Sequence, residues 1–241
     1  MEKIYSRRKA LQLGLGGVAA GPLFSSMARA AQSPVLVELF TSQGCSDCPP
    51  ADKLAAQLMK EPGVFVVSMN VDYWDYLGWK DTLGKAEWSR RQETYAKQRG
   101  DGEVYTPQMV INGMEHAVGS NRGAVDAAIA SARKKAALVP VSLRQNGNEI
   151  SISVGPGAGK AQVGLLTLTP EVAVKIGRGE NAGATVTYHN VARKLDVLGE
   201  WDGTAKVFTA GQASGDPGQF IAILQSVETG QVMGCSAFTV S

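Results

Sequence analysis

Two cysteines, Cys45 and Cys48, are the residues of this chain best suited to chemistry. They form a C-x-x-C pair between an apolar, β-branched segment at 35–40 and a segment at 51–60 whose Leu and Met residues recur at helical spacing. The first segment predicts a strand and the second a helix. Two thiols placed this closely at a strand-to-helix junction can form a small, reversible disulfide, so the pattern indicates thiol–disulfide chemistry.

The elements after the cysteines determine how the pair would be held. Segments at 64–72 and 85–98 have the patterns of a strand and of a polar helix, and an aromatic loop joins them. The Asn-Gly pair at 112–113 predicts a hairpin turn, because both turn positions need positive φ, and a helix is expected over 121–137. Strand, C-x-x-C helix, strand, helix, X-Pro, hairpin and helix is the order of elements in the thioredoxin fold. We therefore predict an α/β thioredoxin-like domain over residues 31–138.

The pattern changes near Pro140. Short alternating runs separated by Gly-rich or Asn-Gly turns follow, at 141–144, 149–154, 162–169, 185–189, 205–209 and 220–227. Such spacing is typical of all-β structure. We therefore predict a smaller antiparallel β domain over residues 139–241, which could shield the cysteines or present a partner.

The first 30 residues have the features of an export signal. A twin arginine at 7–8 precedes an apolar run that ends in an A-x-A site at 28–30. The run is interrupted before it reaches the ~20 apolar residues that a membrane-spanning helix needs. We therefore predict a signal peptide over residues 1–30, of the twin-arginine or the general secretory type. The mature protein is expected in the periplasm or secreted, with no membrane span after cleavage.

The charge balance excludes one class of partner. Residues 1–30 hold five of the 24 basic and one of the 22 acidic side chains, so the formal charge of the mature chain becomes −2 instead of +2. The remaining basic residues form no clustered Lys/Arg stripe. A near-neutral chain of this kind has no electrostatic footprint for nucleic acid, so no nucleic-acid partner is predicted.

Four motifs give the chain a resemblance to a known family. They stand at 37–52 (V-E-L-F-T-S-Q-G-C-S-D-C-P-P-A-D), 71–81 (V-D-Y-W-D-Y-L-G-W-K-D), 105–113 (Y-T-P-Q-M-V-I-N-G) and 178–183 (R-G-E-N-A-G). With them the chain resembles the secreted thioredoxin-like proteins catalogued only as a domain of unknown function, DUF1223. One residue departs from the family pattern, because Asn70 stands where a His often precedes the second motif. The resemblance implies a fold and a compartment but no established activity.

The resemblance also suggests roles for individual residues. It implies a cis peptide bond between Thr106 and Pro107 that faces the cysteines and leaves the Thr106 backbone free to pair with a substrate strand. Thioredoxins keep a buried carboxylate on the strand before the first cysteine, and Glu38 lies near that place, offset by one residue from the usual spacing. Proton transfer by Glu38 is therefore one hypothesis, and an ordinary strand residue paired with a Lys or Arg is the other.

The two cysteines would have different roles in a thioredoxin-like arrangement. Cys45 would be the exposed, attacking thiolate and Cys48 the buried resolving thiol, because a helix N-terminus favours negative charge on the first sulfur. Attack, mixed disulfide and resolution is the expected cycle. Asp47 adds a negative charge inside the motif, and Pro49 disfavours an α conformation at Cys48 and would delay the regular helix to Pro49. Both features should raise the free energy of a Cys45 thiolate, so we expect a weaker oxidant than the strongest periplasmic ones.

The aromatic loop at 73–79 has two interpretations. Parallel strands at 35–40 and 64–72 would bring it to the same sheet edge as the cysteines, where Trp74 could help to bind a substrate. Alternatively, Trp74 and Trp79 could anchor the second part of the chain against the first, which requires no substrate.

Three functions are consistent with the sequence. The first is an exported thiol–disulfide oxidoreductase that acts on protein thiols or disulfides together with a redox partner, without a cofactor or bound metal. The second is a copper or zinc handling protein, which would need His116, His189 or Cys235 to join the two cysteines as ligands. The third is a non-catalytic thioredoxin-fold binding module with a structural disulfide, although a ring closed by so few residues gains little loop entropy. Burial as a small apolar residue is the simplest explanation of Cys235.

Overall fold

The computed structural model describes Met1 and residues 33–135, 139–146, 149–211 and 218–239. The predicted signal peptide at 1–30 therefore lies outside the described residues, apart from Met1. Within the described ranges, none of the helices has the length and apolar character needed to cross a membrane.

The N-terminal half alternates strands and helices in the predicted order. Its elements are β1 (Val35–Thr41), α1 (Pro49–Leu58), β2 (Val64–Asn70), the 3₁₀ helix η1 (Asp75–Leu77), α2 (Ala86–Arg99), β3 (Gln108–Ile111), β4 (Glu115–Val118) and α3 (Arg122–Lys135). The predicted hairpin turn is confirmed, because Asn112 and Gly113 have φ values of 46° and 73°. Local sequence signals therefore place these elements to within a few residues.

The start of α1 confirms one prediction and contradicts another. The regular helix begins at Pro49, as predicted. Cys48, however, has helical angles (φ −77°, ψ −37°), although a residue before proline disfavours them. The Cys48 carbonyl accepts the first two helical hydrogen bonds, from the N–H groups of Ala51 (2.9 Å) and Asp52 (3.1 Å). These bonds offset the steric preference, so the expectation for Cys48 was wrong.

The C-terminal half is built of strands in the described residues. They are β5 (Val141–Asn146), β6 (Glu149–Val154), β7 (Ala161–Lys175), β8 (Thr185–Trp201), β9 (Lys206–Gly211), β10 (Gln219–Ser226) and β11 (Val232–Thr239). β7 and β8 are much longer than predicted. Pro170 interrupts the alternating sequence pattern of β7. It falls opposite Asn190 of β8, whose φ is 48°, so both strands depart from regular geometry at the same place. The pairing of β7 with β8 continues past this place.

Strands from both halves share one sheet. The eight-stranded mixed sheet has the order β11-β10-β7-β8-β2-β1-β3-β4, and β5, β6 and β9 form a second, three-stranded sheet. β2 joins β8 in parallel at Ser68 and Val191, and Ser68 Oγ also donates to the His189 carbonyl (2.8 Å). Residues 31–241 form one compact unit. The predicted boundary at 139 thus marks a change of secondary structure and not a break in the sheet.

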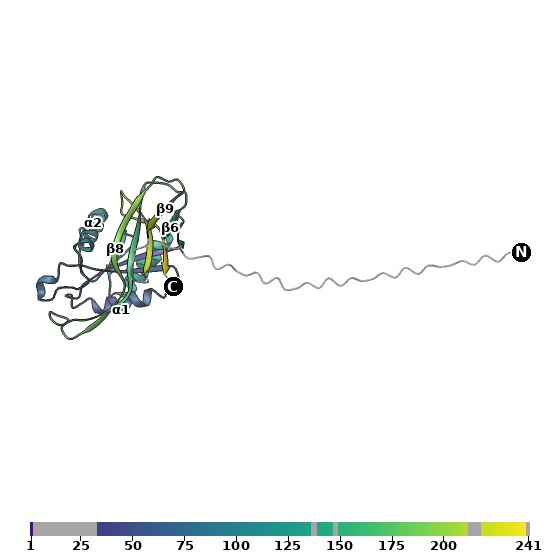
Figure 1. Cartoon of the computed structure of the whole chain (residues 1–241). Coiled ribbons are helices and arrows are strands. Elements are labelled where there is room, and N and C mark those ends of the chain that lie inside the picture. Colours follow the sequence, from purple (N-terminus) through teal and green to yellow (C-terminus); the bar gives the residue numbers. More distant parts are fainter. Residues whose placement is uncertain (2–32, 136–138, 147–148, 212–217, 240–241) are drawn as a thin grey trace. The chain divides into compact units, whose positions relative to one another are not determined.

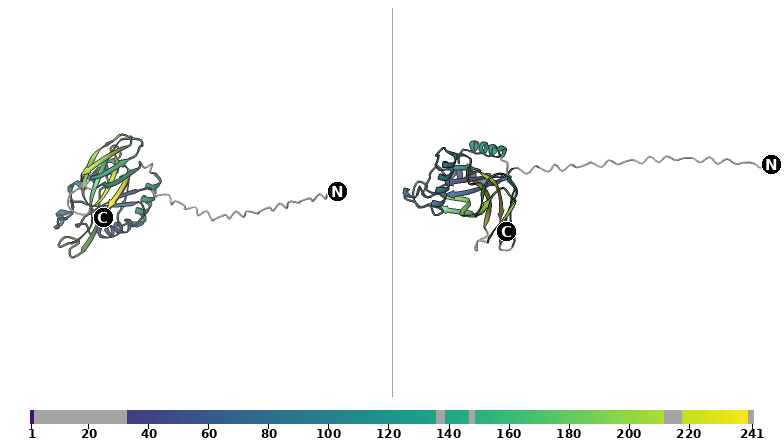
Figure 2. Two further views of the ribbon diagram at one scale, coloured as in Figure 1. Left: turned by 45° about the vertical axis from the view of Figure 1, so that its right-hand side comes forward. Right: turned by 90° about the horizontal axis from the view of Figure 1, so that it is seen from above.

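The two faces of the central strands are covered differently. α1 and α3 pack on one face, where their apolar side chains meet Val37 and Leu39 of β1. α2 packs on the opposite face together with apolar residues of β7, β10 and β11, around Leu36 and Phe40. Figure 1 shows the positions of α1 and α2 relative to the long strand β8, and the right view of Figure 2 shows α3 as the teal helix along the outside. The cysteines lie at the N-terminal end of α1, and α1 packs on the same face of the sheet as α3.

Candidate functional site

The two predicted cysteines form a disulfide at the N-terminal end of α1. Their Cα atoms are 5.4 Å apart. The Cys48 N–H donates to the Cys45 carbonyl, and the Cys45 N–H donates to the Ser42 carbonyl, both at 3.2 Å, so the loop is wound tightly before the helix begins. Only 3% of Cys45 and 0% of Cys48 is exposed. The expectation that Cys45 is exposed was therefore wrong for the disulfide form, in which neighbouring segments hold the loop down.

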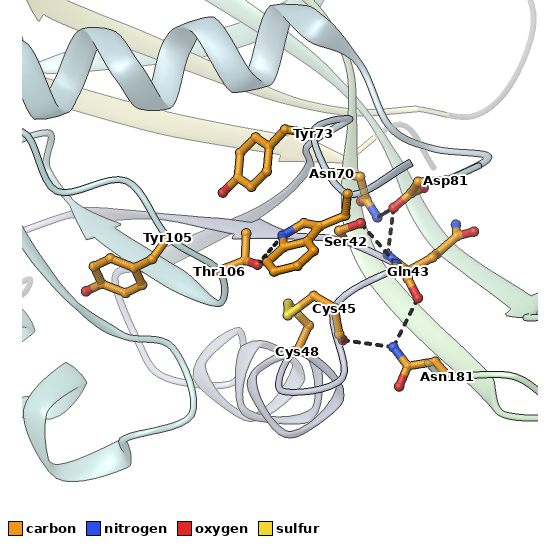
Figure 3. The surroundings of a disulfide bond; sticks show 12 residues. Ser42, Gln43, Cys45, Cys48, Asn70, Tyr73, Asp81, Tyr105, Thr106 and Asn181 are labelled. Atoms are coloured by element: carbon orange, nitrogen blue, oxygen red, sulfur yellow. Dashed lines mark hydrogen bonds between the residues drawn. A yellow bond between two sulfur atoms is a disulfide. The ribbon is translucent and has the colours of Figure 1, made fainter. Parts of the chain in front are cut away.

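Three other predicted residues are brought to this end of α1. The Thr106–Pro107 peptide bond is cis, as the resemblance implies. A methyl group on Gly119 would come within 3.1 Å of Ala51 Cβ and 3.3 Å of Pro107 Cβ, so Pro107 lies beside the first turn of α1. The Trp74 indole Nε1 donates to Thr106 Oγ1 (2.7 Å), as the dashed line at Thr106 marks in Figure 3.

Trp74 also closes the space over the cysteine loop. A methyl group on Gly44, the residue before Cys45, would come within 3.0 Å of Trp74 Cβ. Trp74 stacks on Tyr76 with ring centroids 6.4 Å apart, and Tyr76 is exposed. The exposed Tyr76 thus lies next to the partly buried Trp74 beside the cysteine loop, and the binding of a substrate by Trp74 stays a prediction.

Trp79 fits the other interpretation of the aromatic loop. Its ring packs on the turn between β7 and β8, where a methyl group on Gly177 would come within 3.1 Å of it. Its Nε1 donates to Gln43 Oε1 (2.8 Å), which belongs to the cysteine loop. Trp79 therefore anchors the C-terminal half against the segment before Cys45, whereas Trp74 reaches Thr106.

Sequence reasoning missed Asn181, which holds the cysteine loop from the β7–β8 turn. Its Nδ2 donates to the carbonyl oxygens of Gln43 (3.0 Å) and Cys45 (2.8 Å). Figure 3 shows this side chain reaching the loop from a strand connection of the C-terminal half. The motif at 178–183 gave a signal for the segment, but the sequence could not show which loop it meets.

Asp81 also binds the loop that carries Cys45. Its Oδ2 accepts from the Gln43 N–H (2.8 Å) and from Asn70 Nδ2 (3.1 Å), and its Oδ1 accepts from the Leu83 N–H (2.7 Å). Burial raises the pKa of Asp81, and these donors oppose that shift. Asn70, the residue that departs from the family pattern, thus acts here as an amide donor to a buried carboxyl group (Figure 3).

Glu38 does not lie with the cysteines. Leu39 and its alternate neighbours face α1, whereas Glu38 shares the opposite face of β1 with Phe40. There Glu38 accepts from Arg91 Nε (2.7 Å) and from the Tyr95 hydroxyl (2.5 Å). Side chains of a strand alternate between faces, so the one-residue offset seen in the sequence moves this carboxylate to the far side of the sheet. The hypothesis of an ordinary strand residue paired with an Arg describes Glu38.

A different carboxyl group lies at the cysteine helix. Asp52, in the first turn of α1, is 2% exposed, and neither of its oxygens has a hydrogen-bond partner. Burial raises the pKa of Asp52 to about 8; the nearby Thr41 hydroxyl lowers it, although its geometry falls outside that of a hydrogen bond, and the charge of Asp81 raises it further. An Asp in a first helical turn is commonplace, because it complements the helix dipole, so the sequence carried no signal for this residue.

The candidate metal ligands do not gather in one place. His116 Nδ1 is hydrogen-bonded to the Tyr105 hydroxyl (2.8 Å), and His189 Nδ1 lies 3.4 Å from Glu171 Oε2. Cys235 is buried in the core beside α2, and burial, followed by the charge of Glu38, raises its pKa to about 12. Within the part of the chain that the structure describes, no three His, Cys, Asp or Glu side chains are grouped as a metal site needs.

The fold and the site together define a class of protein: an α/β protein with a C-x-x-C disulfide at a helix N-terminus, next to a cis proline. The chain belongs to the family described as "Protein of unknown function (DUF1223)", whose model matches residues 36–225. No curated protein matches the chain.

Solved structures resemble the chain over most of its length. A crystal structure of a protein from Agrobacterium tumefaciens is 32% identical, with a TM-score of 0.77, and the match covers 88% of this chain and 97% of that one. HBP35 of Porphyromonas gingivalis is 13% identical, with a TM-score of 0.59, and the match covers 87% of this chain and 76% of that one. The second likeness shows the fold alone.

Proposed function

We propose that this protein is an exported thiol–disulfide oxidoreductase with a thioredoxin-like N-terminal part, acting on protein thiols through Cys45 and Cys48. The observation that carries the proposal is the placement of the disulfide at the N-terminal end of α1, with Pro107 in a cis peptide beside the first turn of that helix. The free N–H groups of a helix N-terminus stabilise a thiolate, which is the nucleophile and the leaving group of thiol–disulfide exchange.

The surroundings of the disulfide support a protein substrate. Trp74, Thr106 and Pro107 lie at the same end of α1, and the exposed Tyr76 extends the aromatic surface away from the cysteines. Aromatic side chains next to a backbone segment can bind an extended polypeptide. The redox partner would be a second dithiol or disulfide protein in the same oxidising compartment.

The burial of both cysteines favours a second candidate, a binding module in which the disulfide is structural. The two sulfurs are covered in this form, and Asn181 fixes the loop that carries Cys45. Against this candidate, a ring closed between residues only three positions apart gains little loop entropy, so such a bridge contributes little stability.

Counting alkylated cysteines by intact mass across a glutathione redox series decides between them. We expect one reversible two-electron step that involves Cys45 and Cys48, and a Cys48→Ser variant that accumulates a mixed disulfide on Cys45. Cys235→Ser in the otherwise wild-type protein is the control, because Cys235 is buried and should take no part in the redox step. A pair that never cycles would leave the structural module, and a metal adduct that protects the pair from alkylation would favour metal handling.

A further inference from the structure

One carboxyl group beside the cysteine pair has no role in the function proposed above. The backbone N–H of Asp52 donates to the Cys48 carbonyl (3.1 Å), which places Asp52 one helical turn after Cys48. Side chains four positions apart on a helix have their Cβ atoms about 5–6 Å apart. Asp52 therefore projects from the same face of α1 as the resolving cysteine.

The surroundings of Asp52 favour the protonated carboxyl group. Both of its oxygens are buried without a hydrogen-bond partner, whereas the oxygens of Asp81 accept from backbone N–H groups and from Asn70. A buried carboxylate without donors is unfavourable, and the group binds a proton instead. Asp52 is thus the carboxyl group of this region that holds a proton near neutral pH.

A cavity connects Asp52 with the solvent side of α1. Its volume is about 380 Å³, and it lies between α1 and β8, with Asp52, Lys53 and His189 among its lining residues. The lining is mostly apolar but includes the polar side chains of Asp52, Lys53 and His189, and a cavity of this size has room for water molecules, which can carry protons. A proton held by Asp52 can therefore be exchanged without passing through the substrate face at Trp74.

We propose that Asp52 is the proton carrier of the Cys45–Cys48 couple, an inference that rests on the proposed oxidoreductase function. A substrate thiolate attacks Cys45 Sγ and forms a mixed disulfide, while the Cys45–Cys48 bond breaks and its electron pair goes to Cys48 Sγ. That sulfur takes the proton from Asp52, which becomes a carboxylate. A second substrate thiolate then attacks the substrate sulfur and releases Cys45 as a thiolate, so the substrate loses two electrons and the cysteine pair gains them. To close the pair again, the Cys45 thiolate attacks the disulfide of the redox partner and releases one partner thiolate. Cys48 then gives its proton back to Asp52 and attacks Cys45 Sγ of this mixed disulfide, and the second partner sulfur leaves as a thiolate, so the partner disulfide gains the two electrons.

Several groups from the neighbouring elements surround Asp52. Thr41 of β1 is a neutral hydroxyl, and Asp81 adds negative charge from the loop after η1. On β8, burial holds the pKa of Tyr188 well above its ordinary value, so it stays neutral, and His189 pairs with Glu171. Lys53 of α1 lines the cavity between α1 and β8. In the oxidised protein, where the disulfide-bonded cysteines do not titrate, we expect a change in the rate of disulfide opening near pH 8, the pKa of Asp52.

The test is the rate at which dithiothreitol opens the disulfide, corrected for the thiolate fraction of the reagent, between pH 5 and pH 10. Below pH 8 we expect Asp52→Asn to open at least about tenfold more slowly than the wild type, because it has no acid to protonate Cys48. Above that pH the two rates should converge, since wild-type Asp52 has then lost its proton. The matched control is Glu38→Gln, the same loss of a buried carboxylate on the far face of β1, which should keep the wild-type profile.

Equal profiles for Asp52→Asn and the wild type overturn the inference, and so does a loss seen in Glu38→Gln but not in Asp52→Asn. A wild-type pair that does not cycle at all overturns the proposed function instead. Infrared spectroscopy of the wild-type protein gives a readout that does not depend on a variant. We expect a protonated-carboxyl band that disappears near pH 8 in the oxidised protein and at a different pH in the reduced one. A band that is indifferent to the redox state contradicts the inference.

Discussion

At the scale of the single residue, Asp52 should make the stability of the protein depend on pH. Its pKa is about 8 in the folded protein, against an ordinary value of 3.8. The folded state therefore binds this proton more tightly than the unfolded state, and unfolding releases a proton between about pH 4 and pH 8. The contribution of Asp52 to stability consequently falls as the pH rises through that window, and it becomes constant above the folded pKa.

We expect Asp52→Asn to stabilise the oxidised protein at pH 8 by an amount on the order of a few kcal/mol, and to have little effect at pH 4. The amide keeps the shape of the protonated carboxyl group but cannot ionise, so it avoids the cost of a buried charge. Urea unfolding at pH 4, 6 and 8 measures this difference. Asp126→Asn is the control, because Asp126 is an exposed partner of Arg122 and should change stability by less than about 1 kcal/mol at each pH. A gain that is independent of pH would assign the effect to packing.

At the scale of the element, the β7–β8 turn acts as a clamp on the loop that carries Cys45. Asn181 supplies two hydrogen bonds to carbonyl oxygens of that loop, and Trp79 fills the space beneath the turn. The contacts of Asn181 and Trp79 join this turn to Gln43 and Cys45. The element that holds the cysteine loop is therefore more than 130 positions away from it in the chain.

We expect Asn181→Ala to speed the reduction of the disulfide by dithiothreitol several-fold and to lower the free energy of unfolding by about 1–3 kcal/mol, because two carbonyl groups lose their donor. The reduction rate is measured by alkylation and intact mass, and the stability by urea unfolding. Glu180→Ala is the matched control, since Glu180 is an exposed neighbour in the same turn. An Asn181→Ala protein that is less stable but is reduced at the wild-type rate would show that the clamp does not govern access.

Elements with strong local signals could be predicted from the sequence, and contacts between distant elements could not. The Asn112–Gly113 turn and the strand before Cys45 depend on nearby residues, and both were found. The face of Glu38 could not be read, because every residue of β1 is buried and the strand shows no alternation. Asn181 and Asp52 gain their significance only from segments that the fold brings next to them.

At the scale of the whole molecule, the two halves of the chain share a core. Leu36, Phe40 and Trp88 of the N-terminal half pack in the same cluster as Leu166 and Ile221 of the C-terminal half. Hydrogen bonds also cross this boundary, among them those from the Val232 N–H to the Asn112 carbonyl (2.9 Å) and from Gln225 Nε2 to the Tyr95 hydroxyl (2.9 Å). The change of sequence pattern near Pro140 marks where mixed helices and strands give way to strands alone in the described residues. It carried no signal for the parallel pairing of β2 with β8.

We therefore expect a fragment of residues 31–138 not to fold alone, although its elements have the thioredoxin order. Removing the C-terminal strands would expose several large side chains on the α2 side of β1 and β2, at about 1.5–3 kcal/mol each. The sum is comparable with the 5–15 kcal/mol by which an ordinary domain is stable. Near-ultraviolet circular dichroism and urea unfolding of this fragment, beside residues 31–241, measure the difference. A fragment with a cooperative transition and a fixed tryptophan environment would show instead that the first half is an autonomous domain.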